Sequence, residues 1–312
     1  MARDTLSEIA DIRARSGRGP QRHLFALQML REVWETGGLD SAHEFVPIRL
    51  VTILEVFTQS WVAELIDSGE PYITRSADLA KNGVKIDFSV ARALTGQKVT
   101  IGELIAHALS IYSIEALSHA FTTILGTDFF NLLPGVIPRW KTEVLGEPPQ
   151  PCISDMPFVR TQIAELFKVR HILVHELPLG YFVEKGQVDN FLKAAAELIE
   201  AADQALATLL HGAYPLTQAD MNITAAESAA VAEGELAEVI AALDPTRSDE
   251  ELLASQEAWT AYRGYQSAYR SQINRPGHGS IAPLIYSSEF ETITRERIRQ
   301  LRWYLEREEG DM

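Results

Sequence analysis

The segment FKVRHILVHELP, residues 167–178, places an arginine and two histidines close together near the expected end of a helix. At about 100° per residue, His171 and His175 lie roughly 40° apart, and Arg170 falls within the same arc of roughly 140°. A guanidinium can stabilise charge that develops on phosphorus, and an imidazole can transfer protons near neutral pH. In RNA the neighbouring 2′-hydroxyl can be the nucleophile. The three side chains therefore point to metal-independent cleavage of a phosphodiester.

Other interpretations fit the same three residues. An arginine five residues before a histidine arises often by chance, and a solvated histidine pair or a basic helix end would look alike. His171 and His175, four residues apart, could also share a metal ion. The zinc-peptidase pattern is absent, however, because Ile172 stands where the general base should be. We expect neither a metal nor another cofactor.

Four more residues carry groups that could take part in chemistry. Glu55, on an early apolar segment, could orient a catalytic histidine, or it could be a salt-bridge partner. Lys168 could add positive charge near the motif. His107 and His119 lie in an apolar segment, where a hydrogen-bonded role in the core or at an interface is expected rather than catalysis.

Composition limits the class of protein. The chain has 312 residues, 46% of them hydrophobic, which favours two domains. Its formal net charge of −15 argues against a broad electrostatic grip on duplex DNA. The single cysteine, Cys152, excludes an intramolecular disulfide framework. The N-terminal residues lack an apolar signal region, and no later run resembles a membrane span, so we expect a soluble cytoplasmic protein without membrane association.

Helical signals dominate the first two thirds of the chain. Apolar residues recur at spacings of three, four and seven, and the expected helices span residues 47–67, 99–125, 158–176 and 188–211. Thr100 ahead of Glu103 has the spacing of a capping box, and Pro178 should end the motif helix. Residues 133–157 are rich in Pro and Gly and should form a long surface connection.

A second domain is expected from residue 212. Pro215, Gly234 and Pro245 should separate small alanine-rich helices. Two stronger helical patterns, 248–273 and 287–309, should then form a hairpin. The sequence predicts an all-α protein, with a helical domain at 1–211 and a smaller helical domain at 212–312.

The RHILVH segment resembles the motif of the HEPN superfamily, and the surrounding helices extend the resemblance over roughly residues 40–211. The resemblance implies a helical bundle that dimerises, so that two motifs form one cleft. Many members are metal-independent ribonucleases, often toxins or phage-defence effectors, while others are non-catalytic binding modules. It would assign phosphate binding to Arg170, acid or base catalysis to His175 and a supporting role to His171. A cognate antitoxin or nucleotidyltransferase partner is also implied.

Residues 249–306 resemble the LprI-like family, named for a lysozyme inhibitor. The matching residues are Gln256, Trp259, Tyr262, Arg263, Gly279, Ser280, Thr294, Arg297 and Leu301. Trp259, Tyr262 and Leu301 should pack between the hairpin helices, and Arg263 should bond the Gly-Ser loop or a carboxylate such as Glu296. In exported members this region contains disulfides. Because it has no cysteine here, we expect a scaffold or partner-binding role rather than periplasmic lysozyme inhibition.

Two functions follow as expectations. The first is a dimeric endoribonuclease of toxin or defence type, which the intact Arg170–His175 motif favours. The second is a non-catalytic HEPN-type module that binds a protein or nucleotide, with the C-terminal domain as its recognition surface. The acidic charge favours the second, because a nuclease usually needs a basic path for RNA.

Overall fold

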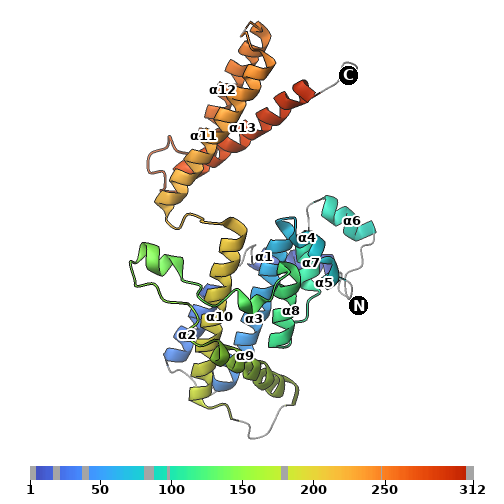
Figure 1. The fold of residues 1–312 in the computed structure, drawn as a ribbon, viewed down its shortest axis with the longest axis vertical. Coiled ribbons are helices and arrows are strands. Elements are labelled where there is room, and N and C mark those ends of the chain that lie inside the picture. Colours follow the sequence, from blue (N-terminus) through green and yellow to red (C-terminus); the bar gives the residue numbers. More distant parts are fainter. Residues whose placement is uncertain are drawn as a thin grey trace. The chain divides into compact units, whose positions relative to one another are not determined.

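The computed structural model describes residues 5–16, 22–36, 42–80, 88–96, 99–176, 182–246 and 248–306. Every regular element within these ranges is helical, which confirms the all-α prediction (Figure 1). The chain divides into two compact units, Met1–Ala213 and Tyr214–Met312. This division lies close to the boundary expected near residue 212.

Unit 1 is built from α-helices with a few shorter turns of other helix types. The α-helices are α1 (Thr5–Ser16), α2 (Arg22–Glu35), α3 (Ala42–Asp67), α4 (Tyr72–Arg75), α5 (Ala77–Ala80), α6 (Phe88–Thr95), α7 (Ile101–His107), α8 (Ile114–Leu125), α9 (Met156–His171) and α10 (Lys185–His211). A 3-10 turn, η1 (Phe129–Asn131), and two π turns, η2 (Trp140–Val144) and η3 (Ile172–Glu176), complete the unit. The predicted connection 133–157 is irregular apart from η2 and the start of α9.

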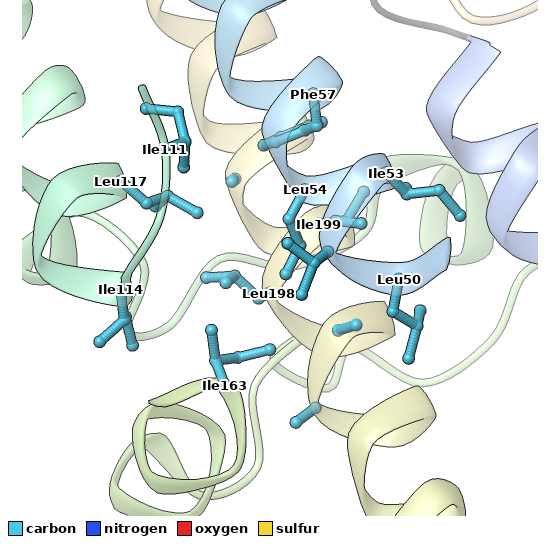
Figure 2. Packing of buried hydrophobic residues seen from close by; sticks show 14 of the residues in the cluster. Leu50, Ile53, Leu54, Phe57, Ile111, Ile114, Leu117, Ile163, Leu198 and Ile199 are labelled. Atoms are coloured by element: carbon cyan, nitrogen blue, oxygen red, sulfur yellow. The ribbon is translucent and has the colours of Figure 1, made fainter. Parts of the chain in front are cut away.

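The core of unit 1 forms around α3, which packs against α2, α7, α8, α9 and α10. Figure 1 shows α3 beside α10, and Figure 2 shows Leu54 of α3 facing Ile199 and Leu198 of α10. Leu117 of α8 and Ile163 of α9 belong to the same buried cluster. The apolar spacing read from residues 47–67 therefore marks the helix on which the other core helices pack.

This central helix also has the length and composition of a membrane span. Within the described ranges, the stretch His43–Asp67, with a hydropathy of 1.3, is the one helix that meets this test. Of its most apolar window, 56% is buried inside the protein. A core helix of a soluble protein meets the same test, so the finding is weak evidence for a membrane span.

The single helix expected over 99–125 is two helices, α7 and α8. Its predicted start is confirmed: Thr100 and Glu103 form a reciprocal capping box. The continuous helix is wrong, because α7 ends at His107 and Ser113 caps a new helix by accepting a hydrogen bond from the backbone N–H of Ala116 at 3.2 Å. A side-chain cap satisfies a backbone donor that a new helix leaves open, so the chain can restart in another direction.

Gly102 allows α7 to approach α3 closely. A Cβ at this position would overlap the backbone oxygen of Ala63 and lie 2.8 Å from Cγ of Asp67. We expect Gly102→Ala to lower the free energy of unfolding by about 1–3 kcal/mol, because a backbone atom cannot move aside as a side chain can. Urea unfolding would measure this loss. Gly186→Ala in α10, where a Cβ meets nothing within 4 Å, is the control and should not destabilise. An unchanged midpoint for Gly102→Ala would contradict the close packing.

Unit 2 contains α11 (Gln218–Leu243), α12 (Glu250–Ser271) and α13 (Ala282–Glu306), and α13 packs against both other helices. The predicted hairpin corresponds to α12 and α13. The prediction of small helices separated at Gly234 is wrong, because α11 continues through this residue. A mid-helix glycine costs about 1 kcal/mol, which the packing of α11 along α13 offsets. Leu236 and Val239 of α11 join Ile298 and Leu301 of α13 in a small core.

The side-chain predictions for four residues of the hairpin have different outcomes. Leu301 is buried and Trp259 packs against the small core, as expected. Tyr262 is 56% exposed, so its predicted packing between the helices is wrong. Arg263 donates to Glu233 and Thr294 rather than to Glu296 or the Gly-Ser loop. Its carboxylate partner belongs to α11, a helix that the sequence analysis did not place against the hairpin.

Candidate functional site

Helix α9 fixes the position of the motif. Asp155 caps its N-terminus by accepting a hydrogen bond from the backbone N–H of Phe158 at 3.0 Å. One face of the helix is buried in the core, through Val159, Ile163, Leu166, Phe167 and Val169. Because this face is anchored, Arg170 is held half-buried at the rim of the core, and the following His171 is exposed.

The motif continues from α9 into the π turn η3, where the sequence predicted an uninterrupted α-helix over 158–176. Hydrogen bonds in a π turn join residues five apart. A π turn therefore aligns two such residues on one side of the helix more closely than an α-helix does. Arg170 and His175 have this spacing, and Arg170 Nη1 lies 3.3 Å from Nε2 of His175. The predicted stop at Pro178 falls outside the described residues.

This contact pairs a hydrogen-bond donor with a group that can accept. A guanidinium can only donate hydrogen bonds, so Nε2 of His175 can accept from Arg170 when the ring proton lies on Nδ1. An imidazole in that form could take up a proton. The ring of His171 lies beside it, with 4.9 Å between the two centroids. The structure therefore brings Arg170, His171 and His175 together, as the sequence predicted.

Glu55 is brought to the same place by the packing of α9 against α3. It is half-buried, and burial raises the pKa of its carboxyl, while the positive charge of Arg170 lowers that pKa by a smaller amount. The charge of Arg170 therefore acts on Glu55, but no hydrogen bond or ion pair joins the two side chains in the described part of the chain. Both roles, orienting a catalytic histidine and forming a salt bridge, stay predictions for Glu55.

Other candidates lie away from this group. Lys168 is exposed and forms an ion pair with Glu165 at 3.5 Å, one turn earlier in α9. His107 lies 3.7 Å from Glu8, and His119 is exposed, so a core role for His119 is wrong. In the described part of the chain, no hydrogen bond, ion pair or ring contact joins either histidine to Arg170, His171 or His175.

Neither a metal site nor a reactive thiol accompanies the motif in the described part of the chain. In the part of the chain that the structure describes, no three His, Cys, Asp or Glu side chains converge as a metal site would require. Cys152 is buried, and burial raises the pKa of its thiol to about 11. The nucleophilic thiolate is therefore scarce at neutral pH.

Sequence reasoning missed an open cavity of about 740 Å³ that is lined by residues of α1, α3, α7 and α10. Arg13 and Glu103, which form an ion pair at its wall, lie far apart in the sequence. Of these residues only Glu103 had a local signal, the capping box. No spacing pattern joins side chains on four separate helices, so only the folded chain reveals this cavity.

Comparison with known proteins supports one of the two resemblances. A family model described as lysozyme inhibitor LprI matches residues 212–301, less than a third of the chain. The C-terminal unit is therefore similar to this family. No curated protein and no solved structure gives a significant match.

Proposed function

We propose that the chain is a metal-independent endoribonuclease of toxin or defence type that works as a homodimer. The observation that carries the proposal is the contact of Arg170 with His175, beside His171, with the carboxyl of Glu55 within the electrostatic influence of Arg170. A carboxyl with a shifted pKa near such a cluster is a frequent feature of catalytic sites. The resemblance of RHILVH to the HEPN motif supplies the reaction class.

The reaction would be a transesterification within the RNA backbone. The 2′-oxygen would attack phosphorus, the bond from phosphorus to the 5′-oxygen would break, and a 2′,3′-cyclic phosphate and a 5′-hydroxyl would form. One proton leaves the 2′-hydroxyl and one must reach the 5′-oxygen. Nε2 of His175 is suited to accept the first, and Arg170 to stabilise the charge on the phosphate oxygens.

A second copy of the chain would complete the site. A base and an acid are needed at the same phosphate, and in a dimer His175 of each protomer could supply one of them. An incoming phosphate would also compete with His175 for Arg170, because charged oxygens bind a guanidinium more strongly than a neutral nitrogen does. RNA binding would thereby release the lone pair of Nε2 for catalysis.

The same argument gives a proposed substrate, location and partner for the enzyme. Its substrate would be RNA, held locally by paired motifs because a net charge of −15 disfavours a broad polyanion surface. A cytoplasmic location would give it access to RNA, and a cognate antitoxin or nucleotidyltransferase would restrain it. Lys168, tied to Glu165, would contribute only at the edge of the site.

The direct test is to incubate purified full-length protein with RNA in excess chelator and to analyse the ends of the fragments. We expect 2′,3′-cyclic phosphate ends and a light-scattering mass of two chains. Intact RNA would refute the proposed activity, and a monomer at micromolar concentrations would refute the shared cleft.

A second candidate is a non-catalytic module that binds a protein or nucleotide. The acidic charge of the chain and the LprI match at residues 212–301 favour it, since the family model covers a separate unit that could recognise a partner. Intact RNA in the chelator experiment would shift the proposal to this function.

Glu55 should act as a positioning residue for Arg170. We expect Glu55→Gln to lower cleavage about tenfold at neutral pH, because the arginine loses the negative charge that orients it. Since burial raises the pKa of Glu55, wild-type stability should fall as pH rises from about 4.5 through this raised pKa. The neutral glutamine should remove that fall. Urea unfolding between pH 4 and 7 would measure it.

The exposed Glu147→Gln provides a control with the same change in charge. It should leave both the cleavage rate and the pH profile of unfolding unchanged. A pH profile of Glu55→Gln that matches the wild type would show that Glu55 is not buried against the motif as described.

A further inference from the structure

The cavity between α1, α3, α7 and α10 has the size of a ligand site. Its volume of about 740 Å³ lies within the range of pockets that hold small molecules. Part of its wall is apolar, formed by Ile9 and Ile12 of α1 and Leu210 of α10. A bound molecule could therefore bury a hydrocarbon or aromatic body there.

The charged groups at the wall are negative in sum. The lining includes three carboxylates, Glu64, Asp67 and Glu103, and one guanidinium, that of Arg13. With neutral histidines these groups sum to two net negative charges. Arg13 donates to Glu103 from Nε at 2.8 Å and forms an ion pair with it. This guanidinium is already matched by a carboxylate, which makes the cavity a poor site for an anion.

Glu64 differs from the other carboxylates. Asp67 accepts a hydrogen bond from the backbone N–H of Gly102 at 2.9 Å, and Glu103 is held by Arg13. Among the described residues, Glu64 has no hydrogen-bond or ion-pair partner for its carboxylate, although it is half-buried. A partly desolvated carboxylate favours a cationic partner, so Glu64 offers an open counter-charge beside the apolar wall.

We propose that this cavity binds a small organic cation, an amine with an apolar body. The ammonium group would pair with Glu64, and the body would lie against Ile9, Ile12 and Leu210. The site uses neither Arg170 nor His175, so it does not depend on the proposed ribonuclease activity. It would give unit 1 a second binding function, which can be measured as ligand binding without any assay of RNA cleavage.

Phenethylamine and phenethyl alcohol are a matched pair of probes, because they share a shape and differ in charge. Calorimetric titration of the full chain should show the amine binding at least about tenfold more tightly than the alcohol. Glu64→Gln should weaken amine binding by about tenfold and leave alcohol binding unchanged, because it removes only the charge interaction. The control Glu147→Gln should bind both probes as the wild type does.

Three results would overturn the proposal: no amine binding at concentrations of about 10 mM, equal affinity for the two probes, or equal affinity of Glu64→Gln and wild type for the amine. A thermal unfolding curve of Glu64→Gln that matches the wild type would show that the variant is folded. His175→Ala should retain full amine binding, which separates this site from the ribonuclease motif.

Discussion

Replacing His175 by alanine should lower the rate of RNA cleavage by about 100-fold or more, since general acid–base catalysis contributes factors of about 10² to 10⁴. The side chain is exposed, so its loss should leave the fold intact. Its Nε2 lies 3.3 Å from Nη1 of Arg170, the group proposed to hold the phosphate. Single-turnover cleavage of a labelled RNA in chelator would measure the effect.

The same variant should relieve toxicity when it is expressed in a bacterial host. His119→Ala is the matched control, because His119 is also exposed but belongs to α8 rather than to the motif. It should cleave RNA and inhibit growth as the wild type does. Cleavage by His175→Ala at the wild-type rate would remove His175 from the proposed mechanism.

Arg170→Lys separates charge from geometry at the same site. A lysine keeps the positive charge but loses the forked donors that can bind two phosphate oxygens at once. We expect it to cleave nearly as slowly as His175→Ala. Activity close to that of the wild type would mean that any positive charge suffices at this position.

Replacing Arg263 by alanine should lower the free energy of unfolding of unit 2 by about 3 kcal/mol, because it removes a large buried side chain together with its hydrogen bonds. The side chain is only 4% exposed and lies between two rings, 3.8 Å from the centroid of Phe290 and 4.7 Å from that of Trp259. It also donates to Glu233 of α11 at 2.8 Å and to Thr294 of α13 at 3.1 Å. One side chain thus joins three helices, and alanine would leave a cavity among them.

Urea unfolding followed by the fluorescence of the tryptophans would measure this loss. Arg270→Ala on the same helix is the control, because Arg270 is exposed and its ion pair with Glu289 spans 3.7 Å. Exposed pairs contribute little, so the control should change stability by less than about 1 kcal/mol. If both variants unfold at the same midpoint, Arg263 does not hold the three helices together.

Local patterns in the sequence predicted many of the helices correctly. The apolar spacing of residues 47–67 marked α3, and Thr100 with Glu103 marked the start of α7. Helix propensity and apolar spacing predicted the wrong helix ends where tertiary packing or a side-chain cap had a larger effect. Gly234 did not interrupt α11, since contacts along α13 exceed the small cost of one glycine, and Ser113 began a helix where apolar spacing alone predicted continuity.

The sequence by itself determined that Arg170, His171 and His175 share one end of a helix, because a helix fixes the angle between neighbours. It did not reveal the π turn, since α and π hydrogen bonding are both open to the same residues and packing around the turn selects between them. Only the tertiary structure brought Glu55 within the electrostatic influence of Arg170, paired Glu233 with Arg263 and placed Glu64 at the wall of a cavity. These pairings depend on how whole helices pack in the two cores, and no local spacing encodes that packing.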